Sequence, residues 1–536
     1  MYGGHIMDIY PTIFNHTLGP VTVGPSSSNT AALFRAGKLI HQLANGIPKN
    51  AVVKLAASTS FARTYLGMKS DLAFINGLLG RSITEPDFDS AYKYASEAAL
   101  SISFDTKSWQ GADTIKGSWI EIICKDNNKL TVIADSIGGG AIKLLEINGC
   151  PVAIEGDYYE LLIFTKKASA EKLKQIADIL LEKNIFIDFF IIEGSDNFSL
   201  IEFKSKNPFD KSLTDLLSNK DEIVKIAALD PVYPVIVNEK AIPPFTTAAE
   251  MVAYANKNNF ELWQAAVEYE KSLCNWTEKQ ILDYAEKLWQ IILTSIEKGM
   301  KSDFSMNGIM TPKAKEIYKS FNTNNILPMG ILDMAVPVSL GVMEFSNASG
   351  LIVCIPTGGS CGIVPAVIYS AGIYLKADND TIAKALLTSG IMGICMTKDN
   401  TFSGGRMGCQ AEVGCGAAMA AGALVQMMGG SPAQSCDAAS MTLQALLGLV
   451  CDPVAGLVQV PCIARNMSAT ATAVVSANSV MAGFDAVIPF DDMFLALKEV
   501  GKIVSPCKGI GCTTTPTGSK LAKAQYKRDM DARRIP

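Results

Sequence analysis

The sequence lacks a basic stripe, and neither sign of charge dominates it. Its 47 Lys and Arg residues are balanced by 52 Asp and Glu residues, which gives a formal net charge of −5. Proteins that bind nucleic acid carry clustered positive charge, so we expect no nucleic-acid partner. Residues 1–14 also lack the basic and continuous apolar segments of a secretory signal. We therefore expect a cytoplasmic protein.

The sequence also lacks a long uninterrupted apolar run, although its mean hydropathy of +0.22 is high. Its most apolar stretches, 335–356, 411–430 and 446–461, are broken by polar residues such as Glu344 and Asp452. Charged side chains are costly inside a bilayer. The pattern therefore predicts buried core helices and no membrane partner.

Cysteine is abundant, with thirteen residues in the chain. Because the cytosol keeps thiols reduced, we do not expect disulfides. Most of the cysteines lie between Cys354 and Cys512, and they are densest from Cys361 to Cys462. They indicate thiolate chemistry, a metal site or plain packing.

Changes of pattern along the chain predict a multidomain α+β protein. Residues 1–157 combine glycine-marked strands with a helix over about 30–44, which predicts an α/β domain. Residues 158–228 follow a βαββαβ order of the ferredoxin-like kind, typical of a small regulatory module. The proline-rich stretch 229–245 is the best linker candidate, and residues 246–536 are helical almost throughout.

Three cysteines stand in turns marked by glycine or proline: Cys409, Cys451 and Cys462. No compact C-x-x-C spacing is present, so their spacing alone leaves buried packing and metal binding both open. The surrounding motifs carry more information than the spacing does.

These motifs resemble the iron–sulfur L-serine dehydratases. The segments similar to the α-chain of that family are GCQAEVG (408–414), GLVCDPVAGLVQVPC (448–462), PTGGSCGIVPAV (356–367) and TPTG (515–518). The segments similar to its β-chain are GPSSSNT (24–30), residues 60–80 and residues 136–149, together with the module at 158–228. The resemblance implies a fused chain with a β-chain-like domain, an ACT-like module and a helical α-chain-like catalytic domain.

The resemblance also implies a cofactor. In that family, the cysteines matching Cys409, Cys451 and Cys462 bind three irons of a 4Fe–4S cluster and leave the fourth iron open. An open iron is a Lewis acid for the β-oxygen of a substrate. The implied protein is an oxygen-sensitive lyase that converts L-serine to pyruvate and ammonia. Its partner is a small amino acid, and we expect a homodimer.

Substrate-binding candidates come from two polar turns. Hydroxyls and backbone amides at the start of a helix suit a substrate carboxylate, although a simple helix cap is the alternative. A glycine loop supplies a second site of the same sort. The substrate-binding candidates are Ser26, Ser27, Ser28, Thr30, Thr357, Gly358 and Gly359.

The chain departs from the family where proton transfer is expected. The family carries histidine at the position of Asn29, and Gly-His-Gly-Thr-Asp where this chain has Gly-Met-Lys-Ser-Asp at 67–71. Neither Asn nor Met accepts a proton at neutral pH. Lys69 is the nearest candidate base, with a solvated surface lysine as the alternative. We therefore take Lys69, Ser28 and Asn29 as catalytic candidates.

Several alternatives remain open. Ala445 replaces an asparagine that is frequent in the family, so the substrate region differs while the cluster motifs are kept, and a cysteine desulfidase-like elimination is one reading. A non-catalytic amino-acid sensor is another. A pyridoxal-phosphate enzyme is disfavoured because no Schiff-base lysine motif is present. Cys361, Cys415 and Cys512 are further candidates to approach the open iron, with packing as the alternative.

Overall fold

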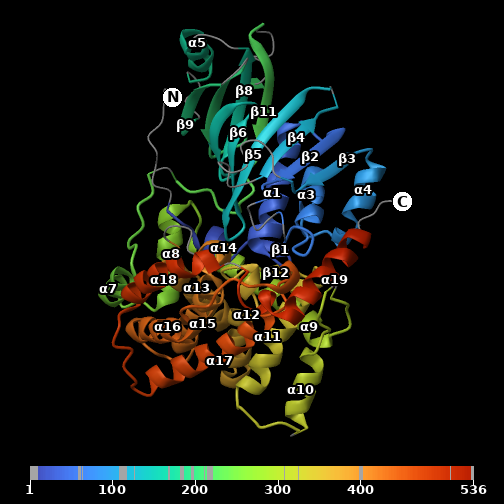
Figure 1. Ribbon diagram of the computed structural model, residues 1–536. Coiled ribbons are helices and arrows are strands. Elements are labelled where there is room, and N and C mark those ends of the chain that lie inside the picture. Colours follow the sequence, from blue (N-terminus) through green and yellow to red (C-terminus); the bar gives the residue numbers. More distant parts are fainter. Residues whose placement is uncertain are drawn as a thin grey trace.

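The structure is a computed structural model with a β-rich amino-terminal part and a largely helical carboxyl-terminal part (Figure 1). It therefore confirms the mixed α+β class. The described residues are 10–57, 62, 64–107, 118–125, 127–166, 170–181, 186–194, 198–210, 212–213, 221–238, 240–306, 308–323, 325–397, 402–507 and 509–532.

A six-stranded sheet forms most of the amino-terminal part, in the order β3-β2-β4-β5-β6-β7. Only the β2 and β3 pair is parallel. Alternating burial along β2 places one face of this strand on the core. The strands are β2 (Asn50–Leu55), β3 (Ser101–Asp105), β4 (Ser118–Ile123), β5 (Lys129–Gly138), β6 (Ala141–Ile147) and β7 (Cys150–Ile154); the helices are α1 (Ala32–Leu43), α3 (Ser70–Leu78) and α4 (Ala91–Glu97).

A four-stranded antiparallel sheet follows, in the order β11-β8-β10-β9. This is the strand order of a ferredoxin-like βαββαβ unit. One face of the sheet packs on α5, and Leu162 and Leu200 on the other face share a hydrophobic core with the six-stranded sheet. Its elements are β8 (Tyr159–Lys166), α5 (Ala170–Leu181), β9 (Asp188–Glu193), β10 (Phe198–Ser205) and β11 (Ile223–Leu229). The second helix of the predicted βαββαβ order falls on residues 212–220, of which only 212–213 lie within the described part.

The remaining part is a helical assembly. Residues 248–273, part of the segment predicted to be helical almost throughout, form two helices, because Asn259 adopts a left-handed conformation and Glu261 begins a new capped helix. The helices are α7 (Ala248–Asn258), α8 (Leu262–Leu273), α9 (Glu278–Lys301), α10 (Ala314–Asn322), α11 (Leu332–Asn347), α12 (Ile363–Leu375), α13 (Asn379–Ile394), α14 (Gly404–Met407), α15 (Val413–Met427), α16 (Pro432–Leu446), α17 (Cys462–Met481), α18 (Phe490–Val504) and α19 (Pro516–Ala532). No helix in the described residues is long and apolar enough to cross a membrane.

The start of the described chain is built into the helical part. Strand β1 (Val21–Val23) pairs antiparallel with β12 (Leu351–Val353). The π-helical turn Ile13–Thr17 is buried in the helical core. Val235 and Phe245, from the predicted linker, are buried in the same core. These contacts bring the first turn of α1 next to loops that lie more than 300 residues later in the chain.

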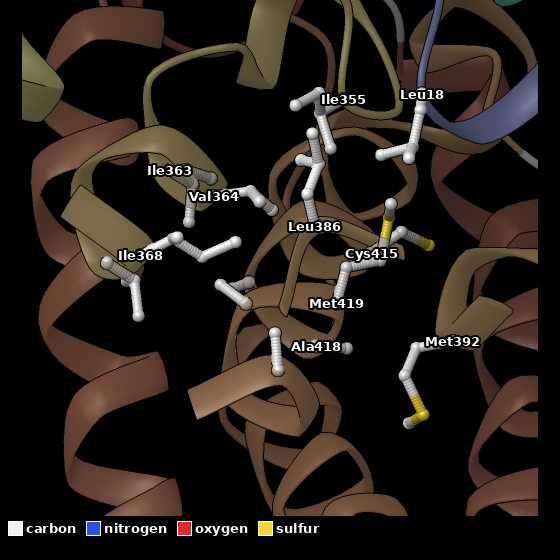
Figure 2. Close-up of a cluster of buried hydrophobic side chains, with 14 of the residues drawn as sticks. Leu18, Ile355, Ile363, Val364, Ile368, Leu386, Met392, Cys415, Ala418 and Met419 are labelled. Atoms are coloured by element: carbon white, nitrogen blue, oxygen red, sulfur yellow. The ribbon is translucent and has the colours of Figure 1, made fainter. Parts of the chain in front are cut away.

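Buried hydrophobic side chains fill the space between the inner helices (Figure 2), and several of those on α15 are small. Ala417, Ala418 and Ala421 of α15 are fully buried. Cys415, on the same helix, lies in the labelled hydrophobic cluster with Leu386 and Met419. Cys415 is therefore a packing residue of the core.

Glu270 of α8 is a buried acid that holds the amino-terminal segment. Its Oε2 accepts a hydrogen bond of 2.9 Å from the backbone amide of Ile13. Burial raises the pKa of the Glu270 carboxyl from 4.5 to about 8, while bonds from the Ile13 and Phe14 amides oppose that rise. Between these two values the folded protein binds a proton that the unfolded chain has released. Stability should therefore fall as the pH rises from about 4.5 to 8.

Replacing Glu270 with glutamine should weaken this pH dependence, because glutamine cannot ionise. One such group changes the free energy of unfolding by at most about 1.4 kcal/mol per pH unit within the window. We expect the unfolding midpoint temperature to drop less between pH 5.5 and 8.5 in Glu270→Gln than in the unaltered protein. Glu278→Gln, at an exposed position, is the control. Equal drops in all three proteins would contradict the assignment.

Candidate active site

One cavity of about 560 Å³ lies where the amino-terminal and helical parts meet. Its lining includes Ser28 and Asn29 from the turn before α1, and Met68 from the turn before α3. The helical part supplies the other walls, from loops around α14, α16 and α17 and from α19. The cavity thus draws on segments far apart in the sequence.

All three predicted cluster cysteines line this cavity. Cys409 opens the short turn Cys409–Ala411, Cys451 lies in the loop after α16, and Cys462 is the first residue of α17. Cys409 and Cys451 both act electrostatically on the Cys462 thiol, which shows that the three sulfur atoms share one environment. The fold therefore brings together three cysteines for which the spacing alone left packing and metal binding both open.

Gln410 ties the cysteine loops to each other. Its backbone amide donates to the carbonyl of Leu449 at 3.2 Å, and its side-chain oxygen accepts from the Gly448 amide at 2.9 Å. Its side-chain amide donates to the carbonyl of Leu497 at 3.0 Å. Because Gln410 follows Cys409 directly, these bonds fix Cys409 against the loop that carries Cys451.

Burial holds the protons on two of the cavity thiols. Burial raises the pKa of Cys409 to about 12 and also raises the pKa of Cys462 well above its usual value. The Arg465 guanidinium opposes the rise at Cys409. Without a metal these thiols therefore stay protonated near neutral pH, and a metal would take the place of the protons.

The donor set fits an iron–sulfur cluster. Three thiols in one cavity suit thiolate-ligated iron. Among the described residues, no three Cys, His, Asp or Glu side chains are placed to hold a single metal ion. Cluster cysteines bind separate irons, so their sulfur atoms stand farther apart than the ligands of a single ion do.

The serine turn presents backbone amides at the start of α1. Ser26 caps this turn by accepting a bond of 3.2 Å from the Asn29 amide. Within the described residues, the amides of Ser27 and Ser28 make no hydrogen bond. Ser26, Ser28 and Asn29 line the cavity, whereas Ser27 and Thr30 do not. Both expected features, a helix cap and open amides beside a cavity, are therefore present.

Ser27 and Thr30 position the turn. The Ser27 hydroxyl accepts a bond of 3.3 Å from the Gly358 amide, which joins the serine turn to the glycine loop of the helical part. A Cβ on Gly358 would lie 2.9 Å from the Ser27 nitrogen, so this approach requires glycine. Thr30 donates to the carbonyl of Met68 at 2.7 Å. The two loops and the Met68 turn therefore form one wall.

Glu412 is a cavity residue that the sequence did not single out. Its Oε1 accepts a bond of 2.9 Å from the Thr357 hydroxyl. A Cβ on Gly359 would lie 2.9 Å from the same oxygen, so the missing side chain makes room for the carboxylate. Burial raises the pKa of Glu412 to about 7, and the Thr357 bond and Arg465 oppose the rise. The cavity therefore holds a carboxylate that can carry or release a proton near neutral pH.

Asp452 joins the cysteine loop to the carboxyl-terminal segment. It pairs with Arg465 at 2.8 Å, and its Oδ2 accepts a bond of 2.7 Å from the Cys512 amide. Helix α19 begins shortly after this turn and lines the cavity with Lys523 and Tyr526. The final helix therefore covers the cavity from a turn anchored next to Cys451.

Lys69, the expected base, lies outside the cavity lining. Its Nζ is 3.3 Å from Asp89 Oδ1 and also contacts the Ser349 hydroxyl. The residue has left-handed backbone angles at the start of α3, which turn its side chain toward these partners. An ammonium held by a carboxylate is a poor proton acceptor.

The other candidate cysteines do not reach the cavity. Cys361 is fully buried, with its sulfur 3.6 Å from Met343 Sδ, and Cys415 belongs to the core shown in Figure 2. Cys512 does not line the cavity either, and it contacts Asp452 through its backbone amide and its thiol. Packing is thus the role that the structure gives Cys361 and Cys415.

The chain therefore combines a β-rich part with a helical part that holds a cysteine-lined cavity. The sequence model of the family described as "Serine dehydratase alpha chain" matches residues 257–508. The L-serine dehydratase alpha chain of Peptoniphilus asaccharolyticus is 37% identical over 256 residues, which cover 48% of this chain and 88% of that one. The chain belongs to the L-serine dehydratase alpha-chain family.

Other relatives agree. The probable L-serine dehydratase alpha chain of Bacillus subtilis (strain 168) is 30% identical over 52% of this chain and 94% of its own length. L-serine dehydratase 1 of Escherichia coli (strain K12) is 34% identical over 49% of this chain and 60% of its own length. The chain is thus homologous to L-serine dehydratases over about half of its length, and that half includes all three cavity cysteines.

Proposed function

We propose that the protein is an iron–sulfur-dependent lyase that eliminates a β-substituent from a small amino acid. Relatives of the chain carry the name L-serine dehydratase, which describes such an elimination from L-serine. One observation carries the proposal. A single cavity joins Cys409, Cys451 and Cys462 to an open-amide turn and to the Glu412 carboxylate.

The serine turn is suited to the substrate carboxylate. The amides of Ser27 and Ser28 stand at the positive end of a helix that continues through α1. Because Ser28 lines the cavity, its amide and hydroxyl are placed to orient an anion there. Asn29, whose side-chain amide donates to Ser26 Oγ at 3.3 Å, supports the same wall.

We assign proton abstraction to Glu412 because it is a cavity carboxylate beside the glycine loop, which is bonded to the serine turn. Thr357 fixes one of its oxygens, which leaves the other oriented beside Gly404. When bound by the three cysteines, a 4Fe–4S cluster would supply a Lewis acid for the departing hydroxyl. Arg465 and Lys523 add positive charge to the same cavity.

The reaction balances without an external oxidant. Glu412 takes the α-proton, the electron pair of the Cα–H bond forms the Cα=Cβ bond, and the Cβ–O pair leaves with hydroxide. The resulting enamine takes up a proton at Cβ and is hydrolysed by water. The products of L-serine are pyruvate and ammonia.

We further propose that residues 1–157 are β-chain-like and that 158–228 is an ACT-like module. The strand order β11-β8-β10-β9 supports the second assignment. Fold alone does not assign a ligand to the module.

A non-catalytic sensor is the second candidate. Asn29 and Met68 line the cavity where the resembled family carries histidine, and no imidazole is found among the described lining residues. A sensor would bind a small amino acid at the serine turn without releasing ammonia.

A substrate panel separates these possibilities. Anaerobically purified protein should release ammonia from L-serine, and faster from L-cysteine or β-chloro-L-alanine if the altered cavity depends on a better leaving group. Ammonia and keto acid should appear in equal amounts, because each elimination yields one of each. Binding of these compounds, seen as a rise in unfolding temperature, without any product would favour the sensor instead.

A further inference from the structure

A second cavity, of about 310 Å³, lies apart from the cysteine-lined one. Its walls come from the π-helical turn Ile13–Thr17, helix α1, the loop after α3 and Tyr284 of α9. Three of its lining residues, Arg35, Lys38 and Arg81, are basic, and none of the lining residues that the structure describes is acidic. The cavity therefore has a positive wall.

Arg35 is a buried charge without an ion-pair partner in the part of the chain that the structure describes. Its side chain is only 6% exposed. It donates to the carbonyl of Gly140 at 2.8 Å, and its guanidinium carbon lies 4.1 Å from the centre of the Tyr233 ring. Glu155 and Arg35 both act electrostatically on His16, but Glu155 is itself paired with Lys143 at 2.9 Å. No described carboxylate forms an ion pair with Arg35, and a buried charge of this kind normally has a counter-ion.

The other two basic residues of the lining are Lys38 and Arg81. Lys38, one helical turn after Arg35, has no hydrogen-bond or ion-pair partner among the described residues. Arg81 pairs with Glu85 at 2.8 Å through Nη2, while its Nε is buried without a partner. Gly80 holds this loop close to α1, since a Cβ there would fall 2.9 Å from the His41 ring. The loop that carries Arg81 is thus fixed beside α1.

We propose that this cavity binds a small oxyanion, a carboxylate or a phosphate, through Arg35 and Lys38. The guanidinium can donate two parallel hydrogen bonds to such a group, and the ammonium adds a third donor. Phe34, Val232 and Tyr284 form an apolar wall that suits a short organic remainder. A volume of this size accommodates a small metabolite.

The test measures the unfolding midpoint temperature with increasing phosphate or propionate, against chloride at equal ionic strength. We expect either oxyanion to raise the midpoint above the chloride value, because a ligand that binds only the folded state stabilises it. A response to phosphate alone identifies a phosphate site, and a response to propionate identifies a carboxylate site. In Lys38→Gln, the concentration needed for half of the effect should rise about tenfold or more.

Two controls locate the anion. Lys93→Gln changes an exposed lysine on α4, and Lys523→Gln removes a lysine of the larger cavity; both should keep the response of the unaltered protein. Arg35→Gln should abolish the response, and Lys38→Gln carries the test if that variant does not fold. The proposal is overturned if neither oxyanion exceeds chloride, if Lys38→Gln responds normally, or if only Lys523→Gln loses the response. The test requires no cluster and no turnover, so it is independent of the proposed function.

Discussion

Replacing Cys462 with serine is expected to reduce ammonia release to background and to lower the iron content well below that of the unaltered protein. Cys409→Ser and Cys451→Ser should do the same. Each change removes one thiolate from a site with only three protein ligands, and a serine hydroxyl is a much poorer ligand for iron. Anaerobic purification followed by iron, inorganic sulfide and ammonia assays measures all of these effects.

Cys507→Ser is the matched control, because Cys507 is half-buried like Cys451 and Cys462 but does not line the cavity. It should keep both iron and activity. Circular dichroism would establish that each variant is folded. Full iron content in the Cys409, Cys451 and Cys462 variants would contradict the assignment of a cluster to this cavity.

Replacing Glu412 with glutamine should lower turnover by roughly a hundred- to ten-thousand-fold, the usual effect of losing a general base. Glutamine keeps the size of the side chain and can still accept the Thr357 hydrogen bond, but it cannot take the α-proton. We expect iron content to stay unchanged, since Glu412 is not a proposed ligand. Steady-state kinetics with the best substrate of the panel measures the effect.

Glu344→Gln separates this role from the general cost of changing a buried glutamate. Glu344 is fully buried, whereas Glu412 is half-buried at the cavity, and Glu344 accepts bonds of 2.6 and 3.1 Å from the backbone amides of Lys313 and Ala314. It lies outside the cavity lining, so its variant should retain turnover. If Glu412→Gln works as well as the unaltered protein, another group must take the proton.

Local patterns predicted much of the fold. The βαββαβ strands at 158–228 were recognisable because each carries a run of β-branched and aromatic residues. The junction between the amino-terminal and helical parts could not be recognised from the sequence. Strands β1 and β12 have three residues each, and their pairing joins Val21 to Val353 across most of the chain. Short strands with distant partners leave no periodic signal.

The site could be predicted only in part, because resemblance identified motifs and not contacts. Lys69 was chosen for its nearness to a missing histidine, but its orientation depends on Asp89 and Ser349, which only the fold brings near. Glu412 was visible as a lone charge in the apolar stretch 411–430. A buried acid next to a cysteine turn was the signal that could have identified it. Its partner Thr357 is 55 residues away in the chain.

The central claim is that the cavity lined by Cys409, Cys451 and Cys462 performs a metal-dependent β-elimination. The most direct test measures iron and product in one anaerobic preparation of the unaltered protein. The account predicts about four irons per chain, the number in a 4Fe–4S cluster, and ammonia with an equal amount of keto acid from at least one compound of the panel. Removing the iron with a chelator should abolish both products. Iron-free protein that still forms them, or iron-loaded protein that forms neither from any compound, would contradict the account.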